Sequence, residues 1–227
     1  MKNNKILVVA AHPDDEILGC GATVARRINE GYEAYTLILG EGKTARGKNR
    51  SEKKYKTALE TLRKEAQKAN DIIGVKKVYL HNFPDNRFDS IPLLDIVKVI
   101  EEIKNKIKPK IVFTHSYNDL NIDHRIVYNA VLTAARPLPH ETVREIYSFE
   151  VLSSTEWNYP LSFSPDTFID ISKTITDKLE AVKAYRSELR EFPHPRSLEG
   201  IKQAAKYRGM QVGVKHAEAF KSVRIIK

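Results

Sequence analysis

The sequence predicts an α/β fold in which one open, mostly parallel sheet carries helices on both faces. Between residues 6 and 137, apolar segments of strand length alternate with amphipathic segments of helix length, and this alternation is typical of parallel sheets. The first apolar run, Ile6 to Ala11, contains no polar residue, as expected of a strand buried on both faces. The 227 residues contain no internal repeat and no convincing linker, so we predict a single domain over residues 1–227.

The first part of the chain supplies the strand–helix units in order. The predicted strands are Ile6 to Ala11, Glu33 to Leu39, Val75 to Leu80 and Ile111 to Thr114. The helices that follow them are Ile17 to Gly31, Ser51 to Asn70, Ile91 to Ile107 and a segment from Ile126 to Pro137. Each helix has apolar residues at helical spacing. A basic stretch with two glycines, residues 43–50, is predicted to be a loop.

The remaining segments are less regular and extend this Rossmann-like arrangement at its C-terminal end. The predicted strands are Glu145 to Leu152, Phe168 to Ile171 and Ala219 to Ile226, and the predicted helices are Lys173 to Tyr185 and Ser197 to Gln211.

Charge and composition limit the possible partners. Lys and Arg number 38 against 29 for Asp and Glu, a formal charge of +9, which invites an anionic partner but is more simply explained by a soluble, lysine-rich surface. The basic residues are dispersed along amphipathic segments and form no nucleic-acid-binding motif, so we expect no nucleic-acid partner. No apolar run approaches a membrane span or a signal peptide. The single cysteine, Cys20, excludes an intrachain disulfide and fits a cytoplasmic protein.

An acidic turn directly follows the first predicted strand. It contains His12, Asp14, Asp15 and Glu16. In a doubly wound sheet the ligand crevice lies beyond the carboxyl ends of the strands, where the strand order reverses, commonly between the first and fourth strands. The fourth strand leads into a polar loop with two histidines, His115 and His124. The topology therefore places the carboxylate cluster opposite these histidines.

These residue types point to a cation rather than to a dinucleotide. The glycines Gly19 and Gly21 come too late for a phosphate-binding turn, and a carboxylate cluster repels a pyrophosphate. His and Asp side chains around an open coordination position are typical of catalytic zinc, and a spare carboxylate can accept a proton from water. The alternative interpretation is that His12 and the carboxylates only support the start of a helix.

Several segments resemble the zinc-dependent sugar N-deacetylases related to LmbE and PIG-L. The segment Ala11 to Glu16 (AHPDDE) resembles the family's first motif, and Asn121 to His124 (NIDH) resembles its second. Further similar segments are Gly40 to Gly42, Arg63 to Glu65, Phe83 to Asp85, His194 to Ser197 and Ala217 to Phe220. The resemblance therefore extends over almost the whole chain.

The resemblance implies a role for each matching residue. His12, Asp15 and His124 would hold one Zn²⁺ per chain. Asp14 would be the general base that acts on the zinc-bound water, which attacks an acetamide carbonyl and releases acetate and a sugar amine. Asp123 would orient a neighbouring histidine or ligand.

The sequence departs from the family pattern at Asn121, where many members have a histidine that helps to stabilise the oxyanion. An asparagine amide donates hydrogen bonds but carries no proton between groups. Either Asn121 takes this catalytic role, or the positive charge comes from another residue such as His194 or His115. The identity of the general acid stays open.

Polar residues on other loops at the same sheet edge are candidates for binding the sugar. They are Glu41, Asp85 and Arg87. Arg63 on its helix and His194 in the C-terminal segment are further candidates for substrate binding.

The resemblance implies a hydrolase that removes the N-acetyl group from an N-acetylglucosamine-type sugar. The basic charge leaves open whether that sugar carries a phosphate or a nucleotide. Two alternatives remain at this stage: a catalytically impaired carbohydrate- or nucleotide-binding protein, and a metal amidohydrolase that acts on another acylamide. Family members often form trimers or hexamers, so the resemblance also implies a homo-oligomer.

Overall fold

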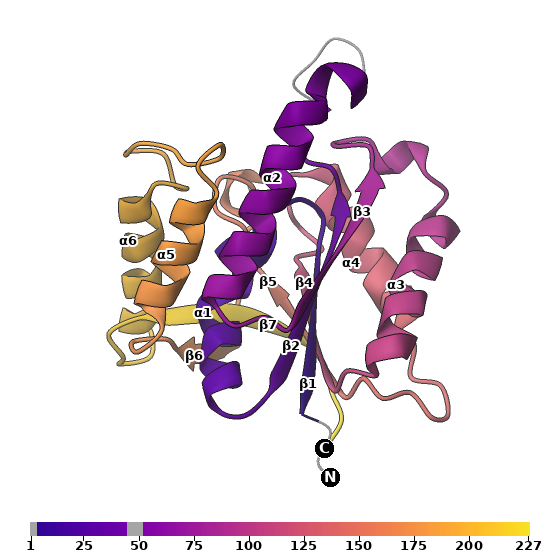
Figure 1. Ribbon diagram of the computed structural model, residues 1–227. Coiled ribbons are helices and arrows are strands. Elements are labelled where there is room, and N and C mark those ends of the chain that lie inside the picture. Colours follow the sequence, from indigo (N-terminus) through magenta and orange to yellow (C-terminus); the bar gives the residue numbers. More distant parts are fainter. Residues whose placement is uncertain (1–3, 45–51) are drawn as a thin grey trace.

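The computed structural model describes residues 4–44 and 52–227, which form one sheet flanked by helices (Figure 1). The strands are β1 (Lys5–Ala10), β2 (Glu33–Gly40), β3 (Lys77–Phe83), β4 (Ile111–His115), β5 (Glu145–Phe149), β6 (Thr167–Asp170) and β7 (Ala217–Ile225). The α-helices are α1 (Asp15–Asn29), α2 (Glu52–Ile72), α3 (Leu93–Ile107), α4 (Ile122–Ala134), α5 (Ile175–Ala184) and α6 (Leu198–Met210). Two short 3₁₀ helices are η2 (Phe88–Ser90) and η3 (Thr155–Trp157).

The strand order confirms the predicted open, mostly parallel sheet. The seven strands lie in the order β3-β2-β1-β4-β5-β7-β6. Strands β1 to β5 pair in parallel, whereas β7 is antiparallel to both of its neighbours, β5 and β6. The order reverses between β1 and β4, so the loops that follow these two strands open into the same crevice.

Alternate side chains explain why β1 is apolar from Ile6 onward. Ile6, Val8 and Ala10 belong to the core on one face of the sheet, beneath α1, α2, α5 and α6, which lie to the left in Figure 1. Leu7, Val9 and Ala11 belong to the core on the other face, beneath α3 and α4 on the right. Because both faces are covered, a polar residue between Ile6 and Ala10 would lose its hydration without gaining a partner.

Helix α1 lies unusually close to the sheet at Gly19. A Cβ atom at this position would overlap the ring of Phe149, a fully buried residue at the end of β5. Only glycine allows the helix and this ring to approach so closely. The glycine in the helix interior, unfavourable by propensity, is thus explained by packing.

Two element boundaries differ from the prediction in ways that affect the site. Strand β3 continues to Phe83, through residues predicted to form a loop, because at the edge of the sheet its polar side chains remain exposed. Helix α4 begins at Ile122, several residues earlier than predicted, so Asp123 and His124 lie in its first turn. Most of the predicted loop over residues 43–50, and Ser51, lie outside the described residues.

Within residues 4–44 and 52–227, no helix combines the length and the apolar character that crossing a bilayer requires.

Candidate metal centre

The turn between β1 and α1 separates two adjacent aspartates. Asp15 is the first residue of α1, whereas Asp14 precedes the helix with φ of 99° and ψ of −29°. Positive φ is costly for a residue other than glycine and persists only where the surroundings hold it. Here the Asp14 carbonyl accepts hydrogen bonds from the amides of Ile17 and Leu18 at 3.1 and 2.9 Å. The Asp14 amide donates to the Glu16 carboxylate at 3.1 Å.

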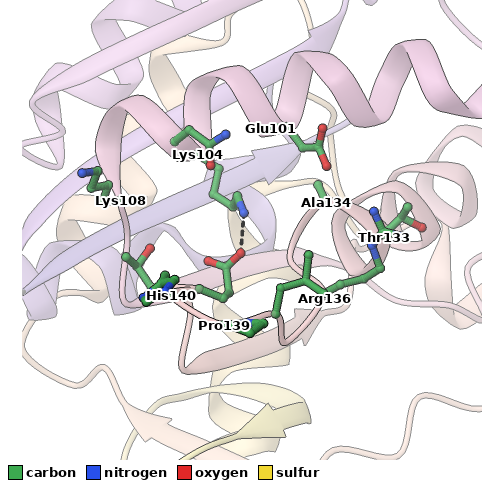
Figure 2. A pocket seen from close by; sticks show the side chains of 12 residues that line it. Glu101, Lys104, Lys108, Thr133, Ala134, Arg136, Pro139 and His140 are labelled. Atoms are coloured by element: carbon green, nitrogen blue, oxygen red, sulfur yellow. Dashed lines mark hydrogen bonds and ion pairs between the residues drawn. The ribbon is translucent and has the colours of Figure 1, made fainter.

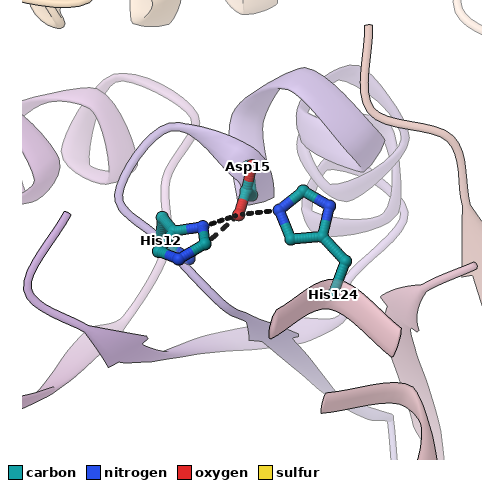
Figure 3. A group of neighbouring side chains, drawn as sticks. All are labelled: His12, Asp15 and His124. Carbon is teal, nitrogen blue, oxygen red and sulfur yellow. Dashed lines mark hydrogen bonds and ion pairs between the residues drawn. The ribbon is translucent and has the colours of Figure 1, made fainter. Parts of the chain in front are cut away.

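Three buried side chains converge at the end of β1 (Figure 3). The Oδ2 atom of Asp15 lies 3.4 Å from Nδ1 of His12 and 3.2 Å from Nε2 of His124. The side chains of Asp15 and His124 are 1% exposed, and that of His12 is 11% exposed. The backbone amide of His12 donates to the same Asp15 oxygen at 2.9 Å. The structure thus brings together the three predicted ligands, and their candidate ligand atoms all lie within 4.8 Å of one another.

These spacings fit a tetrahedral metal ion. Bonds of about 2.0–2.1 Å at tetrahedral angles separate neighbouring ligand atoms by roughly 3.3 Å, close to the two distances that Asp15 makes with the histidine rings. Neither ring nitrogen of His124 makes a well-aligned hydrogen bond within the described residues, although the ring is buried. Two imidazoles and one carboxylate match the ligand chemistry of zinc.

Each candidate histidine ligand is oriented by a second carboxylate. Nε2 of His12 lies 2.9 Å from Oδ2 of Asp123, while the other oxygen of Asp123 accepts from the Phe88 amide at 3.0 Å. Nδ1 of His124 lies 3.1 Å from Oδ1 of Asp119. Such contacts fix the ring orientation and increase the basicity of the ligating nitrogen. The expected role of Asp123 in orienting a histidine agrees with this geometry, whereas the sequence reasoning missed Asp119.

The carboxylates of Asp15 and Asp119 favour positive charge at the candidate metal centre. Burial disfavours a charged His124 ring, but Asp15 and Asp119 raise the pKa of His124 to about 9. Burial also opposes ionisation of Asp119, yet its contact with His124 and the hydroxyl groups of Ser154 and Thr155 lower its pKa to about 2. The site therefore stabilises a cation, which a divalent metal ion would supply.

His115 lies in the site as a neutral ring. Its Nε2 atom accepts a hydrogen bond from the Ala11 amide at 2.8 Å, which places any ring proton on Nδ1. The ring stacks on His124 with centroids 3.9 Å apart. Burial lowers the pKa of His115 well below its usual value. This residue therefore supports the ring of His124 and is poorly suited to supply a positive charge.

The side chain of Asp14 forms an ion pair with Arg196. Nη1 of Arg196 donates to Oδ2 of Asp14 at 3.0 Å, and the Asp14 side chain is 8% exposed. Burial raises the pKa of Asp14 to about 7, against the opposing charge of Arg196. Arg196 belongs to the C-terminal motif segment, but His194 in that segment was the predicted site residue. The sequence feature that could have indicated Arg196 is that an arginine, which stays positively charged, lies within the segment His194 to Ser197.

Glu16 also supports the turn through hydrogen bonds of its carboxylate. Its carboxylate accepts hydrogen bonds from Tyr185 and from Nδ2 of Asn70, and burial raises the pKa of Glu16 to about 8. Because it also accepts from the Asp14 amide, Glu16 helps to hold the strained residue in place.

Asn121 caps helix α4. Its Oδ1 accepts from the Asp123 amide at 2.8 Å, and its Nδ2 donates to Asn86 at 3.0 Å. The cap explains why the helix begins before His124 and thereby aims this histidine at Asp15. The catalytic role of Asn121 stays a prediction.

The five predicted substrate-binding residues have different environments. Asp85 is buried, with Oδ1 3.3 Å from Nε2 of His12, and Glu41 is buried and accepts from the Thr44 hydroxyl at 2.6 Å. Arg63 donates to Asn82, Arg87 is exposed, and the ring of His194 lies 6.0 Å from that of Trp157. Asp85 is therefore the one that directly contacts a candidate metal ligand.

A separate hollow of about 390 Å³ lies away from the candidate metal centre (Figure 2). It is formed by the C-terminal ends of α3 and α4 and by the segment before β5, and its lining includes Lys104, Arg136, His140 and Glu141. Lys104 and Glu141 form an ion pair across it. None of the predicted site residues lines this hollow.

A family of known proteins matches the part of the chain that contains the candidate metal centre. The family model of PIG-L, described as GlcNAc-PI de-N-acetylase, matches residues 7–135, which include all three candidate ligands. The chain belongs to the PIG-L family. The predicted resemblance is thus confirmed, and the matched residues cover both halves of the metal centre.

Relatives in this family include deacetylases from distant organisms. The uncharacterised deacetylase YaiS of Escherichia coli K12 is 30% identical over 192 residues, covering 82% of this chain and 92% of YaiS. The diacetylchitobiose deacetylase of Thermococcus kodakarensis is 27% identical, covering 96% of this chain and 83% of the relative. The crystal structure of the conserved protein TT1542 from Thermus thermophilus matches with a TM-score of 0.77 and 26% identity, covering 98% of this chain and 96% of TT1542.

Proposed function

We propose that this PIG-L family protein is a zinc-dependent hydrolase that removes the N-acetyl group from an N-acetylated amino sugar. Membership of the family identifies the chain as a hydrolytic N-deacetylase. The observation that carries the zinc-dependent mechanism is the placement of Asp15 between His12 and His124, with a second buried carboxylate, Asp14, in the same turn.

The residues of the chain divide the work of amide hydrolysis. His12, Asp15 and His124 would hold Zn²⁺, which lowers the pKa of a water molecule and polarises a carbonyl oxygen. Asp14 takes the proton from the attacking water. Asp123 and Asp119 keep the two histidine rings in position.

Asp14 is also suited to return the proton to the departing amine. Burial raises its pKa to about 7, and a group with a pKa near the working pH both accepts and donates protons efficiently. His115 accepts a backbone hydrogen bond and His194 accepts from the Arg196 amide, so neither is as well placed for this role. We therefore propose Asp14 as general base and then general acid.

The amino-sugar substrate is supported by the relatives. One of them is a diacetylchitobiose deacetylase, and another, from Bacillus cereus, is a probable N-acetyl-α-D-glucosaminyl L-malate deacetylase, 27% identical over 81% of this chain. The formal charge of +9 favours a sugar that carries an anionic group.

Acetate release from a panel of substrates tests the proposal. The panel comprises N-acetylglucosamine, its 6-phosphate, UDP-N-acetylglucosamine, diacetylchitobiose and an N-acetylated amino acid, each with zinc-loaded protein. We expect acetate from at least one sugar. Asp14→Asn should lower kcat by roughly 10²- to 10⁴-fold while zinc remains bound.

The matched control is Asp71→Asn, which makes the same change at an exposed residue at the far end of α2. It should release acetate at the native rate. Turnover of the amino acid alone would refute the sugar substrate, and native turnover by Asp14→Asn would refute the mechanism.

A further inference from the structure

The carboxylate of Asp14 accepts a hydrogen bond from a residue near the other end of the chain. Within residues 4–44 and 52–227, its hydrogen-bond donor is Nη1 of Arg196, at 3.0 Å. We propose that Arg196 is a positioning residue that holds the Asp14 carboxylate in its catalytic orientation. The inference rests on the proposed role of Asp14 as the proton-transfer group.

Arg196 is itself held in a fixed orientation. Its Nε atom donates to the carbonyl of Leu152 at 3.1 Å and to the hydroxyl of Ser153 at 2.7 Å. Its backbone amide donates to Nδ1 of His194 at 3.1 Å. The guanidinium is planar and rigid, so fixing Nε also fixes the direction of the Nη1 group. Arg196 therefore presents its donor to Asp14 before any substrate arrives.

Asp14 needs such support at its side chain because its backbone is already strained. The φ of 99° is held by hydrogen bonds at its amide and at its carbonyl, but these bonds leave the carboxylate free to rotate. Rotation about the side-chain bonds would move the carboxylate oxygens by more than an ångström. The contact with Arg196 selects one orientation, and proton transfer requires donor and acceptor within about 3 Å.

The charges around Asp14 point to the same role. Two other buried carboxylates, Asp15 and Glu188, repel the charge of Asp14. Arg196 is always protonated, and it offsets this repulsion at the Asp14 oxygen that it contacts. A neutral donor would align the carboxylate without opposing this repulsion, which explains why an arginine suits the position.

Kinetics of Arg196 variants provide the first test. Arg196→Ala should lower kcat by roughly 100-fold, with KM and zinc content near native values, because the carboxylate loses its alignment. Arg196→Lys should recover part of this loss. Millimolar guanidinium, far below denaturing concentrations, should partly restore turnover in Arg196→Ala.

Two controls separate positioning from general effects. Arg186→Ala removes the same charge from an exposed residue of the same segment and should keep native kinetics with no response to guanidinium. Asp14→Asn should also show no response, since it lacks the carboxylate to be positioned. Native kcat in Arg196→Ala, or a loss in that variant that neither lysine nor guanidinium restores, would overturn the inference.

The second test does not depend on turnover. A double-mutant cycle with Asp14→Asn, Arg196→Gln and the double variant is measured by urea unfolding of the zinc-loaded protein. We expect the two changes to be coupled by roughly tenfold in the unfolding equilibrium constant, about 1.4 kcal/mol.

The two tests fail in distinguishable ways. Additive effects in the cycle would show that the two side chains do not act on each other, which overturns the positioning role. Coupling in a protein that releases no acetate from any substrate would support the contact and refute the proposed function instead.

Discussion

Asp14 and Asp15 have the same side chain but different environments, because their backbone conformations differ. Asp15 has helical backbone angles and points back toward the end of β1, where the histidines lie. Asp14 has positive φ, which turns its side chain toward the C-terminal segment and Arg196. The positive φ of Asp14 therefore gives the candidate ligand Asp15 and the proposed proton acceptor Asp14 different surroundings.

At the residue scale, Asp123→Asn should weaken zinc binding while leaving the fold intact. The amide is nearly isosteric with the carboxylate, but it cannot stabilise the charge that His12 acquires as a ligand. We expect the zinc dissociation constant to rise by roughly 10- to 100-fold, measured by competition with a chelating indicator.

The matched change is Asp95→Asn, at an exposed residue in the first turn of α3, which should bind zinc as the native chain does. Native affinity in Asp123→Asn would mean that its 2.9 Å contact with His12 does not tune the metal centre.

At the scale of elements, the start of helix α4 sets the direction of His124. Asn121→Ala removes the cap and should cost roughly 1 kcal/mol of unfolding free energy. Asn121→Ser keeps a capping oxygen and loses the amide donor. Urea unfolding and acetate release on both variants therefore separate the structural role from the catalytic one.

The two possible roles of Asn121 give different results. If Asn121 only caps the helix, Asn121→Ser should retain near-native stability and kcat. If its amide stabilises the oxyanion, Asn121→Ser should retain stability but lose roughly 10²- to 10³-fold in kcat.

Helix α1 provides a second prediction at this scale. Gly19→Ala places a methyl group against Phe149 and should lower the unfolding free energy by roughly 1–3 kcal/mol. Gly21→Ala is the matched change in the same helix, where the three nearest atoms to the new methyl group all belong to the side chain of Ile17, at 3.2 Å or more. It should be neutral or slightly stabilising, because alanine favours helices. Equal effects of both variants on urea unfolding would contradict the packing explanation.

The elements show which parts of the fold and site the sequence could predict. The apolar run of β1 and the regular alternation that follows it specify the parallel sheet, and the crossover rule then brings His12 opposite His124. The residues that hold these side chains in place could not be predicted from the sequence. Asp119 and Arg196 reach the site through loops whose conformation depends on packing, and no periodic pattern reports on such contacts.

At the scale of the whole molecule, the candidate ligands join two distant segments of the chain. His12 and Asp15 follow β1, whereas His124 belongs to α4. The unfolded chain does not hold these groups together, so zinc at this centre would bind chiefly to the folded state. Removal of zinc by EDTA should lower the thermal midpoint; at a free zinc concentration of 100 times Kd the stabilisation is roughly 2.7 kcal/mol.

Asp15→Asn is the control for metal removal, because it lacks the shared carboxylate. Its thermal midpoint should not respond to added zinc or to EDTA. A native chain whose midpoint is equally unresponsive would show that zinc does not bind preferentially to the folded protein.

The position of β7 within the sheet also has a consequence for biosynthesis. Strand β6 pairs only with β7 among the described strands, and β7 follows it by more than the length of two helices. While the ribosome makes the chain from β6 to β7, β6 therefore has no hydrogen-bonding neighbour. The three candidate ligands, in contrast, are all made before β5. A nascent chain can thus contain all three candidate metal ligands before its sheet is complete, and Arg196, the proposed positioning residue, is added in the interval between these two events.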